Sequence, residues 1–186
     1  MKRMTSLSAD ETPFGLLRDI ERRSLASGAE LPREEERKPE WAGVVFKLDS
    51  NLLAASLHDI AEVMDCPPYT PVPRTKAWLK GIANVRGHLL PIIDLSVYLG
   101  GEKTPSLRAA RILVLRHGML SVGILVDEVL GQRHFLDEDR CPLPTLESGG
   151  VMNYVRPFAY RKDRDVWLVF DARKLLVEPE FMHAAQ

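Results

Sequence analysis

Short apolar runs separated by polar turn signals fill the chain from residue 43 onward. GVVFKL (43–48) and NLLAASL (51–57) flank an Asp-Ser-Asn turn signal, a pattern typical of a β-hairpin. The order of strand, polar turn and strand returns three more times, in residues 77–95, 111–129 and 151–170. The pattern therefore predicts four hairpins and a mainly all-β fold.

Less regular segments connect these hairpins. Residues 58–64, HDIAEVM, have helical or turn character. The prolines of CPPYTPVPR (66–74) predict an irregular connection, because proline cannot donate a backbone hydrogen bond. Residues 131–150 contain two prolines and a Gly-Gly pair, and we expect a loop there.

The chain also contains a weak internal repeat. Residues 46–63 resemble 113–129 in their order of strand, polar turn, strand, acidic residue and valine. Residues 88–99 resemble 165–176, since each has a strand, an aspartate and a helical turn that ends in leucine. Each half thus holds two hairpins, which predicts two similar small barrels within one domain.

The aspartates of this repeat, Asp94 and Asp171, each stand between a strand and a helical turn. We interpret both as N-caps, because a carboxylate at that position accepts backbone N–H bonds from the turn. The alternative is an acid/base pair. The cap interpretation is preferred because it explains both copies at once.

The N-terminal residues follow a helical pattern instead. Pro13 suits a first helical position, and Phe14, Leu17 and Ile20 recur at helical spacing, which predicts an amphipathic helix. This helix either packs on its own domain or docks on a partner. The domain plan is an N-terminal extension (1–40, with the helix at about 13–27 and a charged linker at 28–40), a main domain (41–178) and a C-terminal tail (179–186).

Composition narrows the class of protein. The 186 residues carry a formal net charge of −1, whereas nucleic-acid binding by the whole chain would need a basic excess. No apolar run approaches the ~18–20 residues of a membrane span, and there is no secretory signal pattern. With only Cys66 and Cys141, which lack metal-ligand spacing, we expect a cytoplasmic, reduced protein without direct membrane insertion.

Residues suited to catalysis or metal binding are scattered. No two of the five histidines have the spacing that would bring them to one metal ion, and phosphate-binding, dinucleotide-binding and nucleophile-elbow motifs are absent from the sequence. The histidines are His58, His88, His117, His134 and His183. We therefore expect no enzyme activity, no metal and no cofactor.

The pair Arg86-Gly87 interrupts the apolar pattern at a predicted hairpin turn. Gly87 can take a positive φ there without penalty, which leaves Arg86 projecting from the corner. Pro91 cannot donate a ladder hydrogen bond, so its strand needs an edge or a bulge. Arg86 is either an ordinary surface arginine or the centre of an interaction corner.

Two segments resemble the signatures of the CheW adaptor family. GIANVRGHLLPIIDLSVYLG (81–100) begins with small apolar residues, continues with Asn-x-Arg-Gly, and then has an apolar strand that contains a proline and ends in Asp-Leu. VGILVDEV (122–129) is similar to the second signature, and the order of elements agrees from about Gly43 to Val177. The resemblance implies two five-stranded SH3-like barrels around a shared core.

The resemblance implies that the chain is non-catalytic, as the members of this family are. They bridge the cytoplasmic hairpin tip of a chemoreceptor to the regulatory domain of a CheA-type histidine kinase, and they are recruited to membrane-associated receptor arrays. By motif match, the partner-binding positions are Ile60, Val63, Asn84, Arg86, Gly87, Gly123, Val126 and Asp127. Leu53-Ala54-Ala55 departs from the family pattern, which commonly has an aromatic residue before the small one.

The N-terminal segment bears on the pathway. TPFGLLRDIERRSLASGAELP (12–32), followed by EWAG, resembles the extension of the CheW-like adaptors that control twitching motility by type IV pili. We therefore expect a pilus-linked adaptor. The alternatives are a coupling protein of flagellar chemotaxis and, with less support, a small β-barrel enzyme.

Overall fold

The computed structural model describes residues 13–26, 40–102, 109–144 and 150–184. The chain divides into two compact units, residues 1–37 and 38–186. No helix among the described residues is long and apolar enough to cross a membrane. The expected charged linker at 28–40 lies outside the described residues, apart from its last residue, which begins the first strand.

The described residues of the first unit form the helix α1 (Pro13–Ala26). Within this unit Phe14, Leu17 and Ile20 are exposed, as is Leu16 beside them. Asp19 on the polar side forms ion pairs with two arginines of the following turn, Arg22 and Arg23. The helical element predicted from the apolar spacing is thus confirmed.

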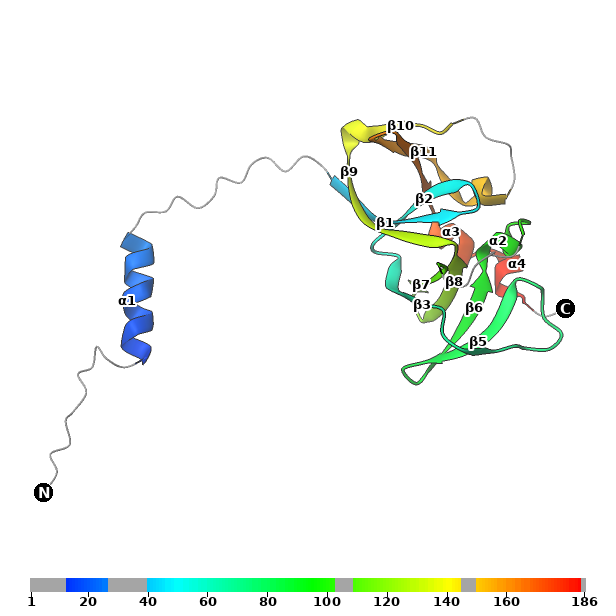
Figure 1. Ribbon diagram of the computed structural model, residues 1–186, viewed down its shortest axis with the longest axis horizontal. Helices are drawn as coiled ribbons and strands as arrows, with labels where there is room; N and C mark the ends of the chain where they lie inside the picture. The colour runs from blue at the N-terminus through cyan, green and yellow to red at the C-terminus, as the bar shows by residue number, and fades with distance from the viewer. Residues whose placement is uncertain (1–12, 27–39, 103–108, 145–149, 185–186) are drawn as a thin grey trace, which may run out of the picture. The chain divides into compact units, whose positions relative to one another are not determined.

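The second unit consists of two six-stranded sheets with short helices (Figure 1). Sheet A has the strand order β10–β11–β12–β2–β1–β9, and sheet B has the order β3–β7–β8–β6–β5–β4. The strands are β1 (Glu40–Leu48), β2 (Asn51–Ser56), β3 (Ile60–Asp65), β4 (Tyr69–Thr70), β5 (Leu79–Val85), β6 (His88–Asp94), β7 (Arg111–His117), β8 (Leu120–Val126), β9 (Glu128–Leu136), β10 (Arg140–Pro142), β11 (Val155–Lys162) and β12 (Asp165–Phe170).

The mainly β class with two subdomains is confirmed, and so are the four hairpins β1–β2, β5–β6, β7–β8 and β11–β12. Each sheet has one strand more than the five we expected. The additional strands are short: β4 has two residues and β10 has three.

The two halves of the sequence do not form one sheet each. Sheet B is the continuous stretch β3–β8, whereas sheet A joins β1 and β2 to β9–β12 from the other end of the domain. The reason is a pair of parallel ladders: β12 lies beside β2, with Val169 opposite Ala54, and β6 lies beside β8, with Ile92 opposite Gly123. The internal repeat is therefore interleaved, and each sheet takes a hairpin from one repeat and strands from the other.

Two connections differ from the sequence expectation. Residues 60–65 form the edge strand β3 instead of a helical turn, because they pair with the distant strand β7. Residues 131–136 continue β9 instead of starting a loop. The register shifts opposite Val45 and Phe46, so that Leu130 is left unpaired as a bulge, and Gly131 takes a φ of 109° next to it.

Side chains on the central strands point alternately to the two faces of the sheet, and each face packs into a different hydrophobic core. Phe46 of β1 and Leu113 of β7 point into a core shared by both sheets. Their neighbours point the other way, Val45 into the aromatic interior of sheet A and Ile112 into the aliphatic interior of sheet B. Because both faces of these strands are covered, they contain continuous apolar runs in the sequence.

The short helices follow strand ends, as predicted. Asp94 caps α2 (Leu95–Tyr98) by accepting from Val97 N, and Asp171 caps α3 (Ala172–Leu176) by accepting from Lys174 N. Two 3-10 helices, η2 (Asp137–Asp139) and η3 (Gly150–Tyr154), precede β10 and β11. The N-cap interpretation of both aspartates is confirmed.

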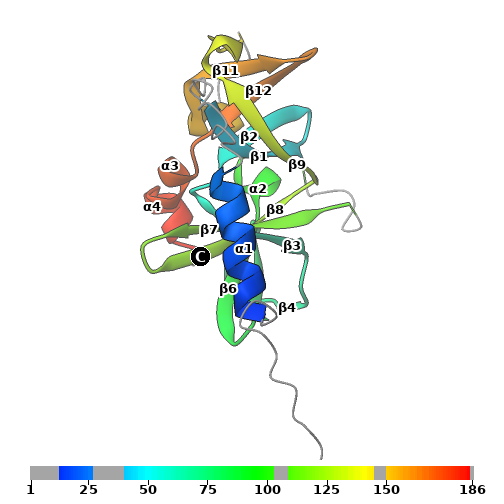
Figure 2. The same cartoon turned by 90° about the vertical axis from the view of Figure 1, so that its left-hand side faces the viewer.

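Residues that we expected to form a C-terminal tail contain α4 (Pro179–Met182), which lies beside α3 (Figure 2). Phe181 of α4 is buried, and its ring stacks on Trp78 with 6.0 Å between centroids. The backbone N–H of Lys76 donates to the carbonyl of Ala184 at 2.8 Å. The packed part of the domain thus extends beyond residue 178.

Candidate partner-binding surface

The turn between β5 and β6 holds the first signature. Arg86 and Gly87 have φ values of 51° and 84°, the pattern of a type I′ turn, which suits the twist of a two-residue hairpin. The side-chain oxygen of Asn84 accepts from the N–H of Gly87 at 2.9 Å. Asn84 and Gly87 therefore shape the turn, and Arg86 is the residue that the turn presents.

Glu62 of β3 positions the Arg86 side chain. A guanidinium nitrogen of Arg86 lies 2.6 Å from a carboxylate oxygen of Glu62, and the two side chains are 75% and 31% exposed. Glu62 was absent from the sequence-predicted set, since no local pattern links two residues that lie in separate strands. The contact holds the long Arg86 side chain in one orientation at the surface.

The two predicted residues of β3 lie on its edge. Val63 is exposed, whereas Ile60 is half-buried and packs on the shared core. Glu62 and Val63 are neighbours in an alternating strand, so their side chains point to opposite faces. Val63 therefore lies near Arg86 in the fold without sharing its face.

Gly123 and Val126 of the second signature are buried, and the structure gives them a packing role. A Cβ atom at Gly123 would lie 2.8 Å from Cγ2 of Ile112 and 3.0 Å from Cδ1 of Ile92. Val126 belongs to the shared core. Both residues are buried, so neither presents a side chain at the surface of this chain, and their part in partner binding stays a prediction.

Asp127 connects three elements. One of its carboxylate oxygens accepts from the N–H of Asp49 at 2.6 Å, and its own N–H donates to the carbonyl of Lys47 at 3.2 Å. Asp49, in the β1–β2 turn, has a positive φ and accepts from the hydroxyl of Ser96 in α2 at 2.8 Å. Asp127 thus orders the β1–β2 turn across the junction between the sheets.

Pro91 is the last residue of β6 before the strand becomes paired on both sides. It pairs with Ile82 of β5, and the ladder with β8 begins only at Ile92. The missing N–H therefore falls where β5 is the one described strand beside β6, which confirms the predicted edge position.

Two exposed apolar residues that the sequence analysis did not single out lie at the same end of sheet B. Because β6 and β8 run parallel and in register, the β5–β6 and β7–β8 turns lie at one end of the sheet. Leu89 of β6 is 73% exposed, and Met119 in the β7–β8 turn is fully exposed. Arg86 and Leu89 belong to the same hairpin, and we call these two residues the Arg86 corner; a charged residue with an exposed apolar residue in one hairpin is a composition typical of interaction sites.

The departure Leu53-Ala54-Ala55 is fully buried in β2. Ala55 lies opposite Phe170 in the parallel ladder, and Phe170 makes an edge contact with Phe46. The aromatic volume at this position of the core therefore comes from β1 and β12. Cys66 and Cys141 are both free thiols.

Comparisons with known proteins bear on the whole chain. The CheW-like domain family matches residues 42–180. Protein PilI of Pseudomonas aeruginosa is 37% identical over 180 residues, which cover 96% of this chain and 99% of that protein. Chemotaxis protein CheW of Helicobacter pylori is 27% identical over 140 residues, 74% of this chain and 84% of that protein.

A solved structure supports the fold. The scaffolding protein TtCheW from Thermoanaerobacter tengcongensis superimposes with a TM-score of 0.62 and 24% sequence identity. The match covers 72% of this chain and 90% of that protein. The likeness extends to the arrangement of two β subdomains.

Proposed function

The chain belongs to the CheW-like domain family, and on this premise we propose that it is a non-catalytic adaptor coupling a chemoreceptor to a CheA-type histidine kinase. The proposed partners are the hairpin tip of the receptor and the regulatory domain of the kinase. The adaptor would be cytoplasmic and recruited to receptor arrays at the membrane.

The Arg86 corner is the observation that carries this proposal. Arg86 is held by a type I′ turn on one side and by Glu62 on the other, while its side chain stays largely exposed. An arginine that is already ordered loses less side-chain entropy when it binds, and its planar fork suits carboxylates and carbonyls of a partner. Leu89 of the same hairpin supplies exposed apolar area.

The eight family positions divide into two groups in this proposal. Asn84, Arg86 and Gly87 form or shape the contact surface at the hairpin tip, while Ile60 and Val63 belong to the edge strand β3 that holds Glu62. Gly123, Val126 and Asp127 act indirectly, by packing β8 and ordering the β1–β2 turn that support this surface.

The pathway that we propose is the control of twitching motility by type IV pili. The match to PilI spans 96% of the chain, so it includes most of the extension that carries α1. The match to CheW of Helicobacter pylori covers 74% of the chain. The extension thus favours a pilus-linked adaptor over a coupling protein of flagellar chemotaxis.

Calorimetric titration of the full chain against the regulatory domain of a CheA-type kinase from the same organism tests the proposal. We expect micromolar or tighter binding, and a loss of affinity for Arg86→Ala. Arg161→Ala, an exposed arginine of β11, is the matched control and should bind like the natural chain.

Two results would overturn parts of this proposal. If neither the kinase domain nor a receptor-tip fragment binds, the adaptor function is wrong. If a flagellar-type kinase domain binds and the pilus-linked one does not, the pathway assignment is wrong while the adaptor function stands.

A further inference from the structure

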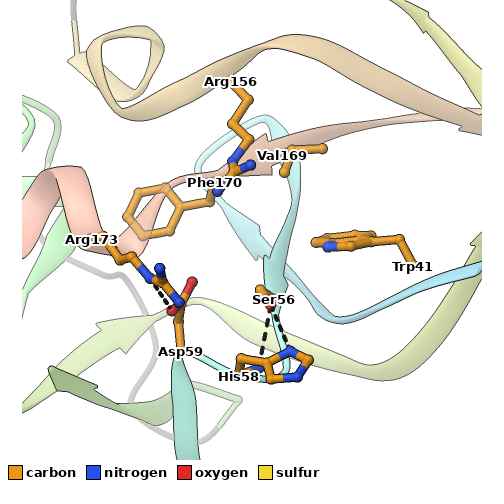
Figure 3. A pocket seen from close by; sticks show the side chains of 8 residues that line it. All are labelled: Trp41, Ser56, His58, Asp59, Arg156, Val169, Phe170 and Arg173. Atoms are coloured by element: carbon orange, nitrogen blue, oxygen red, sulfur yellow. Dashed lines mark hydrogen bonds and ion pairs between the residues drawn. The ribbon is translucent and has the colours of Figure 1, made fainter.

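A second candidate site lies on sheet A. A pocket opens where the start of β1, the end of β2, the strands β11 and β12 and the helix α3 meet (Figure 3). Its polar lining comes from Ser56, His58, Asp59, Arg156 and Arg173, and Trp41 forms one side. None of these residues belongs to the Arg86 corner or to the eight family positions, and we call this site the α3 pocket.

Arg173 is fixed at the pocket by a buried acid. Its Nε lies 2.9 Å from a carboxylate oxygen of Asp59, whose side chain is 8% exposed, while the Arg173 side chain is 61% exposed. Asp59 also raises the pKa of the Arg173 guanidinium, through the hydrogen bond and its charge. The contact engages one edge of the guanidinium, and its terminal amino groups have no other partner among the described residues.

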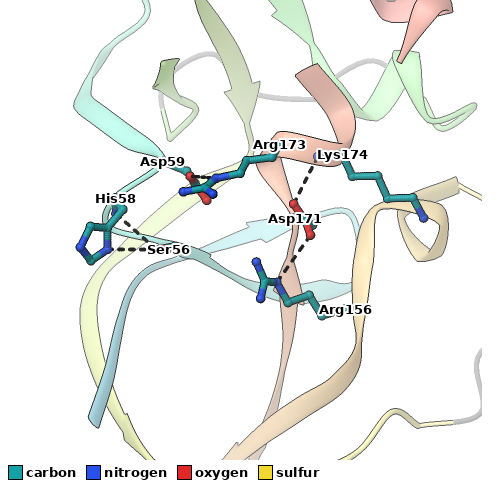
Figure 4. A network of polar contacts seen from close by, with 7 residues as sticks. All are labelled: Ser56, His58, Asp59, Arg156, Asp171, Arg173 and Lys174. Carbon is teal, nitrogen blue, oxygen red and sulfur yellow. Dashed lines mark hydrogen bonds and ion pairs between the residues drawn. The ribbon is translucent and has the colours of Figure 1, made fainter. Parts of the chain in front are cut away.

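Arg156 is held in a similar way (Figure 4). Its Nε lies 3.5 Å from Asp171, the residue that also caps α3. The terminal amino groups of Arg156 have no further partner in the part of the chain that the structure describes. Two guanidinium groups therefore line one pocket. Each forms its ion pair through Nε, and its terminal amino groups remain available to donate hydrogen bonds.

The remaining walls are also ordered. The Trp41 ring stacks on Tyr160 with 5.3 Å between centroids and 14° between planes. The N–H of His58 donates to the hydroxyl of Ser56 at 3.3 Å. Val169 and Phe170 of β12 add apolar lining. The site is thus preformed, which lowers the entropy lost on binding.

We propose that the α3 pocket binds a carboxylate of a partner polypeptide, with an apolar group of the same segment against Trp41. Asp59 and Asp171 each engage one edge of an arginine, and the outward N–H groups of both guanidinium groups remain available to an incoming carboxylate. The planar fork of arginine matches the two oxygens of a carboxylate. The aromatic wall beside it suits the side chain of a peptide better than it suits a bare inorganic anion.

The test uses the full chain labelled with nitrogen-15 and small probes followed by NMR. N-acetyl-glutamyl-phenylalanine amide supplies a side-chain carboxylate, and N-acetyl-phenylalanine supplies a terminal one. We expect saturable shifts of the Trp41 indole and of the Arg156 and Arg173 Nε–H signals. The glutaminyl analogue should bind about tenfold more weakly, because it loses the charge-assisted hydrogen bonds.

Variants test the role of each arginine. Arg156→Gln should weaken binding of the better carboxylate probe about fivefold or more, since one of the two charged forks is lost. Its fold should persist, because Asp171 keeps its bond from Lys174 N. Arg173→Lys keeps a cation beside Asp59 but removes the fork, and it too should weaken binding. Arg133→Gln, which breaks an ion pair with Asp163 elsewhere on sheet A, is the control and should bind unchanged.

Several outcomes would overturn the proposal. These are no saturable shift with either carboxylate probe, equal binding of the glutaminyl analogue, unchanged binding by a folded Arg156→Gln or Arg173→Lys chain, or tighter binding of inorganic phosphate than of both carboxylates. The probes involve neither receptor nor kinase. Failure here would therefore leave the proposed adaptor function untouched, and failure of that function would leave this test valid.

Discussion

Arg86 and Glu62 join the β5–β6 turn to the edge strand β3 through an ion pair of 2.6 Å that spans 24 residues of sequence. Both partners retain contact with solvent, so the pair orients Arg86 more than it stabilises the fold. Exposed ion pairs of this kind contribute only ~0–1 kcal/mol to the free energy of unfolding.

Replacing Arg86 separates these two roles. We expect Arg86→Ala to weaken binding of the kinase domain or receptor tip by roughly 1–3 kcal/mol, the usual range for an interfacial arginine. The free energy of unfolding, measured by urea titration, should fall by no more than about 1 kcal/mol. Glu62→Gln keeps Arg86 and should reduce affinity less. A large loss of stability with unchanged affinity for both partners would show that Arg86 is structural.

Gly123 should be intolerant of any side chain. A Cβ at this position would crowd Ile112 and Ile92, and overpacking of this kind costs typically ~1–3 kcal/mol. We therefore expect Gly123→Ala to lower the thermal midpoint and the urea midpoint. Gly118→Ala, in the open β7–β8 turn, adds backbone strain without a clash and serves as the comparison. A Gly123→Ala chain of normal stability that fails to bind a partner would contradict the packing role.

Asp127 should matter for stability through the β1–β2 turn. Removing its carboxylate in Asp127→Ala leaves the N–H of Asp49 without its 2.6 Å acceptor, a loss of roughly 1.5–3 kcal/mol for a hydrogen bond to a charged group. Amide hydrogen exchange at Asp49 should accelerate. Asp127→Asn retains an acceptor oxygen and should lose less, so equal effects of the two changes would count against this assignment.

The burial of Tyr98 predicts that the stability of the fold depends on pH in the alkaline range. Burial raises the pKa of Tyr98, and the hydrogen bond with the Tyr154 hydroxyl at 3.0 Å adds to the effect. The folded state therefore favours the neutral phenol. This contribution to stability is fully present below about pH 10, the ordinary tyrosine value, and declines as the pH rises beyond it.

An absorbance titration of tyrosinate checks this prediction. Tyr98→Phe should leave the number of tyrosines that ionise between about pH 9 and 11 unchanged, because Tyr98 stays neutral there in the folded chain. The same change should reduce the alkaline loss of stability in urea titrations. Loss of one ionising group in that interval would show that Tyr98 titrates normally.

Sequence patterns correctly predicted the elements that are determined by residues close together in the chain. The four hairpins follow from alternation around short polar turns, and the capping role of Asp94 and Asp171 follows from their place between strand and helix. The strand β3 was expected to be helical, because it pairs only with a strand that begins some fifty residues later in the chain. We expected a loop to start at Gly131, but this residue permits the bulge that lets β9 continue.

The site shows the same division. The Asn-x-Arg-Gly pattern located the corner, but the Glu62 contact is invisible without the fold. The pair Asp59–Arg173 spans 114 residues and was likewise unpredicted. Gly123 and Val126 were identified by their signature, and only the structure shows that both are buried among tightly packed neighbours.

The sequence by itself determined the family, the mainly β class, the hairpins, the internal repeat and the position of the exposed arginine. Only the tertiary structure decided that the repeats interleave, which residues are buried and which charges meet. The physical reason is that turn chemistry and alternation act between neighbours in the chain. The parallel ladders β2–β12 and β6–β8, by contrast, form only when distant strands share one core.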